Sequence, residues 1–125
     1  MTPLLFVAVA IAGGLGATGR LVLDGVIRAR CSSEMPCGTV IINLSGSLVL
    51  GFVTGLTTTL LAPAGWQSII ATGFLGGYTT FSTASFETIR LLQERRSAIG
   101  LLSGLGALVV ATCLAALGMW LGSSL

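Results

Sequence analysis

The stretch that decides the fold is Gly73-Phe74-Leu75-Gly76-Gly77-Tyr78-Thr79-Thr80-Phe81-Ser82-Thr83, which lies inside a long segment without charge. It combines paired glycines with a run of hydroxyls where an apolar helix is expected to cross a membrane. Non-helical backbone is tolerated at that depth only where protein buries it or a watery cavity adjoins it. Transport proteins place ion sites at such interruptions. The stretch therefore predicts an ion pathway built around a broken third helix.

Composition assigns the whole chain to the membrane. Of its 125 residues, 54% are hydrophobic and 8% are charged, whereas a soluble domain carries about 25% charged residues. At about 20 residues per span, the charge-free stretches hold four helices, near 4–27, 38–61, 66–92 and 98–121. We therefore expect an all-α membrane protein in which residues 1–125 form one four-helix transmembrane domain with a broken third helix. Because so small a bundle has little room for a pathway, we also expect a dimer.

The arginines predict how the chain is oriented. Both termini and the second loop fall on one side of the membrane and carry no Lys or Arg. The other side, together with the adjoining helix ends, carries Arg20, Arg28, Arg30, Arg90, Arg95 and Arg96. The positive-inside rule then places both termini outside the cytoplasm. A subunit that inserts in both orientations should show almost no such bias.

Asn43 is the most informative polar residue of the second helix. Neighbouring hydroxyls such as Ser47 and Thr54 can bond to their own helix, but a carboxamide has two donors and two acceptor sites to satisfy. A membrane-buried Asn is therefore either a contact between helices or a ligand group. The residues alone leave both interpretations open.

Charged residues near the helix ends have a similar double interpretation. Arg20, Asp24 and Arg28 are spaced i, i+4, i+8 and can pair along one helix face. Arg20 is then either an interfacial anchor or a cation that attracts anions to a vestibule. Glu87, Arg90 and Glu94 form a comparable series, which we interpret as pairing at a helix end.

The cysteines indicate no metal centre. Cys31 and Cys37 share the first loop, Cys113 is isolated, and the chain has no histidine, so the four ligands of a zinc site are missing. A loop placed in the cytoplasm also disfavours a disulfide.

The break itself offers two kinds of ligand. We expect Gly76-Gly77 to free carbonyls before the turn, and Thr79-Thr80 to cap the helix that resumes. Four such carbonyls from two protomers would suit a desolvated cation such as sodium. Hydroxyl and amide donors and the positive edge of an aromatic ring favour an anion, and these are supplied by Phe81, Ser82 and Thr83.

Three ordered motifs make the chain resemble the Fluc (CrcB) family of fluoride channels over its whole length. They are the Gly-Gly-Leu-Gly-Ala-Thr-Gly-Arg run at 13–20, the Gly-Thr-Val-Ile-Ile-Asn-Leu-Ser-Gly-Ser run at 38–47, and the stretch at 73–83 followed by Glu87. The resemblance implies an antiparallel dimer of inverted protomers with two fluoride pathways. It also implies a structural sodium ion at the dimer centre, held by the backbone carbonyls of Gly76 and Thr79.

The same resemblance implies passive, fluoride-selective export from the cytoplasm that relieves fluoride toxicity, and no enzymatic activity. The implied location is the bacterial plasma membrane, and the partners are fluoride, membrane lipid and a second subunit, without nucleic acid. The expected fluoride pathway comprises Asn43, Phe81, Ser82, Thr83, Ser47 and Arg20.

Two departures from the family pattern bear on the second subunit. Ala84 stands where a second Phe belongs, and Phe86 cannot replace it because it lies about 140° from Phe81 around the helix. The fourth helix presents Ala107 and Ala111 where the family usually has hydroxyls. Together with the arginine bias, these losses favour one half of a heterodimer with an oppositely oriented paralogue, while a homodimer remains the other possibility.

Two other classes of membrane protein agree less well with the sequence. A small multidrug transporter needs a membrane-embedded acid, but Asp24 and Glu87 both lie near helix ends. A purely structural, non-conducting subunit explains the many glycines but not the broken third helix or Asn43.

Overall fold

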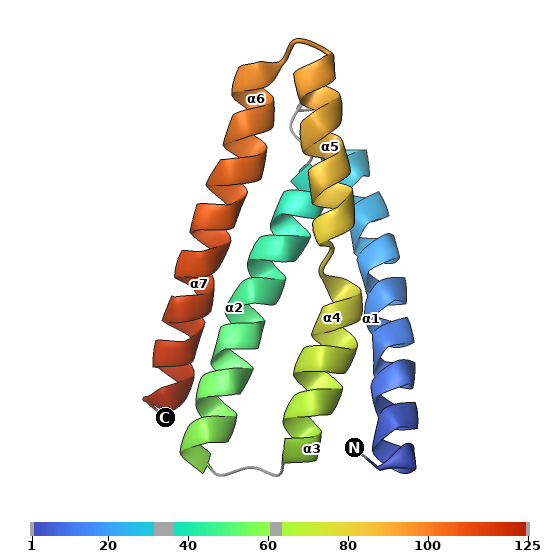
Figure 1. Cartoon of the computed structure of the whole chain (residues 1–125), viewed down its shortest axis with the longest axis vertical. Helices are drawn as coiled ribbons and strands as arrows, with labels where there is room; N and C mark the ends of the chain where they lie inside the picture. Colours follow the sequence, from blue (N-terminus) through green and yellow to red (C-terminus); the bar gives the residue numbers. More distant parts are fainter. Residues whose placement is uncertain (1, 32–36, 61–63, 125) are drawn as a thin grey trace.

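The computed structural model describes residues 2–31, 37–60 and 64–124, with backbone alone for Leu60, Ala64, Phe81 and Ser82. Every regular element in these ranges is a helix, which confirms the all-α class (Figure 1). The α-helices and the two π-helical segments, η1 and η2, are α1 (Pro3–Arg30), α2 (Cys37–Leu60), α3 (Ala64–Gln67), η1 (Ser68–Leu75), α4 (Gly76–Tyr78), α5 (Phe81–Gln93), α6 (Ser97–Leu101), η2 (Leu102–Gly106) and α7 (Ala107–Ser123).

The elements form long rods that run side by side along the longest axis of the molecule (Figure 1). Three rods, Pro3–Arg30, Cys37–Thr59 and Ser97–Ser123, are long and apolar enough to cross a membrane. Between the second and the last, the chain ascends through α3, η1, α4 and α5. Both termini lie at one end of the molecule, and the α5–α6 connection lies at the other (Figure 1).

Glycines allow α2 and α7 to pack backbone against backbone. A Cβ atom on Gly51 would collide with the Ala115 carbonyl, and one on Gly55 would collide with the Met119 carbonyl. The packing is reciprocal, since Gly118 lies equally close to the Leu48 carbonyl. In lipid the hydrophobic effect does not drive helices together, and small residues at the interface allow the close backbone packing that holds membrane helices to each other. These glycines therefore form the packing surfaces of the α2–α7 pair.

A second tight pair joins α1 to η1 and α4. Gly16 lies against the Phe74 carbonyl, and Gly77 lies against the Gly13 carbonyl, each too close for a Cβ atom. Contacts between this pair and the α2–α7 pair are much sparser. The buried hydrophobic residues of the described chain are few, namely Ala12, Ile42, Leu75 and Leu91. Most apolar side chains therefore face outward, as expected for a protein surrounded by lipid or another subunit.

The corner between α1 and α2 corrects one expectation. Cys31 and Cys37 form a disulfide, with their Cα atoms 6.6 Å apart, whereas the predicted cytoplasmic location of the loop argued against one. The expectation considered only the compartment, and the fold brings the end of α1 next to the start of α2.

Replacement of Gly51 by Ala should destabilise the α2–α7 pair. The added methyl must displace the Ala115 carbonyl, and we expect a loss of about 1–3 kcal/mol in the free energy of unfolding from overpacking. Gly25→Ala is the matched control because nothing lies within 4 Å of its Cβ position. Thermal unfolding in detergent measures both variants, and equal melting temperatures would contradict the packing argument.

Candidate functional site

The helix is interrupted at Thr79 and Thr80, which both adopt extended backbone conformations. The Thr80 hydroxyl caps the helix that resumes, because its Oγ1 accepts a hydrogen bond from the Thr83 N–H at 3.2 Å. The predicted cap is thereby confirmed for Thr80. Gly76 and Gly77, which were expected to free carbonyls before the turn, lie within α4, directly before the interruption. Gly77 instead lets α4 approach α1 closely.

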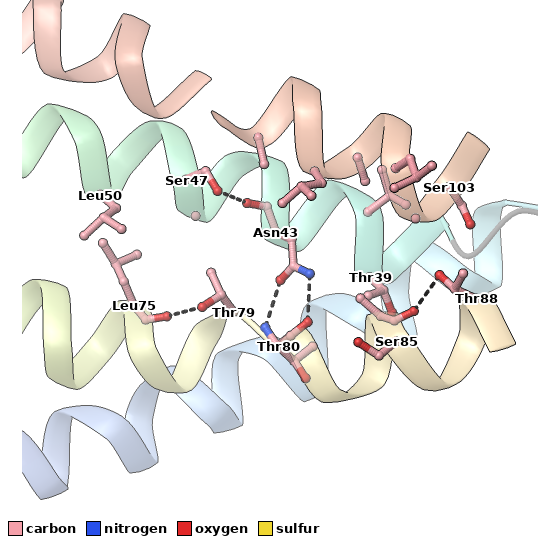
Figure 2. Close-up of a pocket in the computed structure, with 18 of the residues that line it drawn as sticks. Thr39, Asn43, Ser47, Leu50, Leu75, Thr79, Thr80, Ser85, Thr88 and Ser103 are labelled. Carbon is pink, nitrogen blue, oxygen red and sulfur yellow. Dashed lines mark hydrogen bonds between the residues drawn. The ribbon is translucent and has the colours of Figure 1, made fainter. Parts of the chain in front are cut away.

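Asn43 of α2 braces the interruption with two hydrogen bonds (Figure 2). Its Nδ2 donates to the Thr80 carbonyl at 2.8 Å, and the Thr80 N–H donates to its Oδ1 at 2.8 Å. The carboxamide thus pairs with the backbone N–H and carbonyl of a residue that has left the helix, and in this way both backbone groups avoid the cost of an unmade hydrogen bond. Of the two interpretations of Asn43, the structure shows the contact between helices.

This bracing changes which backbone carbonyls are available. In a continuous helix the Thr80 N–H would bond to the Gly76 carbonyl and the Thr83 N–H to the Thr79 carbonyl. Here those donors are used by Asn43 Oδ1 and Thr80 Oγ1. The Gly76 and Thr79 carbonyls, predicted as sodium ligands, therefore lose their helical donors.

A groove of about 590 Å³ opens beside the interruption, between α2, α4, α5 and the η2–α7 rod (Figure 2). None of the described residues that line it is charged. Its polar lining includes Thr39, Asn43, Ser47, Thr79, Thr80, Ser85, Thr88 and Ser103. Ala84, Ala107 and Ala111 also line it. The positions at which the chain departs from the family pattern therefore share one groove.

The predicted pathway residues are only partly brought together. Asn43 and Ser47 line the groove, where the Ser47 hydroxyl donates to the Asn43 carbonyl at 2.8 Å. Arg20 lies elsewhere, on α1, and its Nε donates to the Gly77 carbonyl at 3.3 Å. Thr83 is half-buried beside the cap. The side chains of Phe81 and Ser82 lie outside the described residues, so their roles stay predictions.

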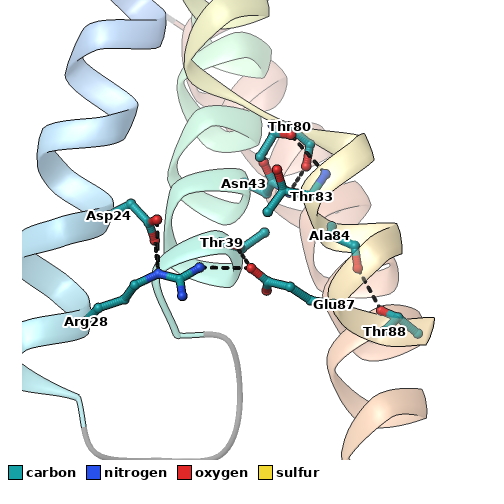
Figure 3. A network of polar contacts seen from close by, with 9 residues as sticks. All are labelled: Asp24, Arg28, Thr39, Asn43, Thr80, Thr83, Ala84, Glu87 and Thr88. Atoms are coloured by element: carbon teal, nitrogen blue, oxygen red, sulfur yellow. Dashed lines mark hydrogen bonds and ion pairs between the residues drawn. The ribbon is translucent and has the colours of Figure 1, made fainter. Parts of the chain in front are cut away.

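Glu87 is the polar residue whose surroundings the sequence did not reveal. It is 5% exposed, and its Oε1 accepts hydrogen bonds from Arg28 Nη2 at 2.9 Å and Thr39 Oγ1 at 3.0 Å (Figure 3). The Arg28 Nε also donates to both oxygens of Asp24 at 3.0 Å. Oε2 of Glu87 is buried without a hydrogen-bond partner among the described residues. We call these four residues, Asp24, Arg28, Thr39 and Glu87, the Glu87 cluster.

Two expectations about pairing are corrected by this cluster. Arg28 pairs with Asp24 as predicted, but Arg20 turns away to the Gly77 carbonyl. Of the predicted series Glu87, Arg90 and Glu94, the Arg90–Glu94 pair is present, with Arg90 Nε 3.9 Å from Glu94 Oε1. Glu87 instead accepts hydrogen bonds from Arg28 and Thr39.

Comparison with known proteins adds the family. A family model described as "CrcB-like protein, Camphor Resistance (CrcB)" matches residues 7–119. The chain belongs to the CrcB family. Relatives in this family include "Fluoride-specific ion channel FluC 1" of Leifsonia xyli subsp. xyli, which is 56% identical over 122 residues, covering 98% of this chain and 89% of the relative.

Two further CrcB relatives carry similar names. "Fluoride-specific ion channel FluC 2" of Cutibacterium acnes is 43% identical over 92% of this chain and 94% of its own length. "Fluoride-specific ion channel FluC" of Rhodospirillum rubrum is 36% identical over 94% of this chain and 90% of its own length. These three relatives therefore match more than nine tenths of this chain.

Replacement of Arg28 by Gln should destabilise the folded chain. It removes the charged donor to a buried carboxylate, and hydrogen bonds to charged groups contribute about 1.5–3 kcal/mol each. Arg30→Gln is the control because Arg30 is an exposed arginine two residues away. Chemical unfolding in detergent should separate the two variants; indistinguishable midpoints would show that the Arg28–Glu87 pair contributes no net stability.

Proposed function

We propose that this chain is a subunit of a passive, fluoride-selective channel in the bacterial plasma membrane. The observation that carries this proposal is membership of the CrcB family, with 56% identity to a protein named as a fluoride-specific ion channel. Three helices of sufficient length and apolarity agree with a membrane location. Downhill movement would export fluoride that accumulates in the cytoplasm.

The chemistry of the groove supports an anion pathway. Fluoride is a small, strong hydrogen-bond acceptor, and the groove offers hydroxyl and carboxamide groups on an otherwise apolar wall. Because no charged residue appears in its described lining, an anion would be held by neutral donors alone. Binding weak enough to permit release is what conduction requires. Asn43 and Ser47 are the groove residues we assign to the pathway, with Phe81, Ser82, Thr83 and Arg20 assigned by resemblance.

An antiparallel dimer would complete the site. Non-helical backbone at membrane depth must be buried in protein or line a cavity, and the Thr79–Thr80 segment adjoins a groove that is open in the single chain. A second, inverted subunit would cover it and make the third membrane span a buried, broken helix. The Gly76 and Thr79 carbonyls of both subunits would then bind sodium, since hard oxygen ligands without competing donors suit that ion.

Two features of this chain and the names of its relatives support a heterodimer. Its arginines are one-sided, which opposes insertion in both orientations. Three alanines line the groove where the family pattern has Phe or hydroxyls. Relatives also carry the numbers 1 and 2 in their names, as paralogous subunits would. We therefore assign this chain to one half of a pair, with termini outside the cytoplasm.

Fluoride release from liposomes tests the function. Liposomes holding only this chain should release little fluoride, whereas liposomes that also hold an oppositely biased paralogue from the same organism should release it rapidly, without chloride. A fluoride electrode follows the release. Rapid fluoride-selective release by this chain alone would establish the channel but refute the heterodimer. Silence of the folded pair would contradict the channel itself.

Asn43→Ala and Asn43→Asp should each reduce fluoride flux in the conducting assembly. Loss of the brace misplaces the interruption, and an effect of only about 1.4 kcal/mol on the barrier lowers the rate about tenfold. Thr112→Val is the control, because this exposed hydroxyl donates to the Leu108 carbonyl of its own helix. Undiminished flux in both Asn43 variants would remove Asn43 from the pathway.

Moving the positive charges to the other side should reverse the orientation of the chain in the membrane. Replacing Arg30, Arg90 and Arg95 by Gln and adding lysines at the N-terminus should move the termini into the cytoplasm. An accessibility tag at the C-terminus reports the side in intact cells. A tag that stays outside in this variant would show that the arginines do not set the orientation.

A further inference from the structure

A covalent bond ties α1 to α2 at the end of the molecule where the arginines gather. Cys31 caps α1, with its N–H donating to the Ile27 carbonyl at 2.9 Å, and Cys37 is the first residue of α2. Six positions apart in sequence, the two residues are joined by a disulfide. The bond therefore sets the separation of two helix ends.

The same two helix ends hold the Glu87 cluster (Figure 3). Arg28 lies one turn before Cys31, and Thr39 lies two residues after Cys37; both donate to Glu87 Oε1. Gly38, between Cys37 and Thr39, lies so close to Asp24 that a Cβ atom there would collide with the carboxylate. Disulfide and cluster thus fix the same α1–α2 separation by independent means.

The charge pattern and the disulfide point to opposite redox environments. The arginine bias places this end in the cytoplasm, where glutathione keeps ordinary cysteines reduced. The fold nevertheless holds Cys31 and Cys37 within bonding range. A pair that is held together in a reducing compartment is suited to reversible oxidation rather than to permanent cross-linking.

We propose that Cys31 and Cys37 are a reversible thiol–disulfide pair that reacts with small disulfides such as oxidised glutathione, and that its oxidation locks the α1–α2 corner around Glu87. One protein thiolate attacks glutathione disulfide and releases one glutathione. The second protein thiolate then attacks the mixed disulfide and releases the other. Two electrons and two protons pass from the protein thiols to two glutathione thiols. This inference does not depend on fluoride conduction.

Thiol counting in cells tests the pair. Full-length Cys113→Ser protein is used, so that only Cys31 and Cys37 react, and cells are acid-quenched before alkylation under denaturing conditions with a maleimide polymer. We expect two adducts in untreated cells, none after treatment with diamide, which oxidises glutathione, and two again after dithiothreitol. Cys31→Ser in the same background should show one adduct in untreated cells and after dithiothreitol, whereas after diamide its Cys37 should retain glutathione as a mixed disulfide, because no second thiol is present to displace it.

Two results would overturn the proposal. Absence of adducts in untreated cells would make the disulfide permanent and place this end on the oxidising side. Two adducts that persist after diamide would show that the cysteines do not pair.

Thermal unfolding of the purified Cys113→Ser protein tests the lock. In the reduced protein, α1 and α2 are no longer joined by the disulfide, so the Arg28–Glu87 pair should contribute more to holding the two helix ends together. Arg28→Gln should therefore lower the melting temperature at least about twofold more in the reduced than in the oxidised form. Arg28→Lys, which keeps the charge, should show a smaller difference of the same sign and covers the case in which Arg28→Gln does not fold. Equal shifts in both redox states would refute the coupling.

Discussion

The Asn43–Thr80 pair is the interaction on which the architecture of this chain depends. An interruption in a membrane helix exposes peptide groups that lipid cannot satisfy. Asn43 accepts from the Thr80 N–H and donates to the Thr80 carbonyl, both at 2.8 Å. One side chain on α2 thereby satisfies the backbone N–H and carbonyl of a residue 37 positions away, so that the interruption is held at a definite place and the helix can resume.

The rest of the site follows from that exchange of partners. Because Thr80 gives its N–H to Asn43, the Gly76 carbonyl loses its helical donor, and the cap at Thr83 does the same for Thr79. Glycines lie at the two closely packed contacts, of α4 with α1 and of α7 with α2. Since the two tight pairs touch each other only sparsely, a groove remains between them, and its neutral polar groups surround the interruption.

The cluster at the arginine-rich end shows a different use of charge. Glu87 is buried, yet Arg28 and Thr39 reach it from two helices, and burying a carboxylate is costly unless it is paired and hydrogen-bonded. The disulfide joins those same two helices. This end of the molecule therefore combines electrostatic, hydrogen-bonding and covalent restraints on one corner, whereas the middle relies on backbone packing and a single carboxamide.

Composition and pattern by themselves determined the all-helical membrane class, and they singled out Asn43 and the stretch at 73–83 for attention. Hydropathy and glycine spacing are local properties, so they are readable along the chain. Only the tertiary structure decided that the helix parts at Thr79–Thr80 rather than at the glycines, that Arg20 turns to Gly77, and that Glu87 meets Arg28 and Thr39. It also joined Cys31 to Cys37. Each of these outcomes depends on which distant backbone or side chain comes within hydrogen-bonding or bonding reach, and the order of residues alone does not specify that distance.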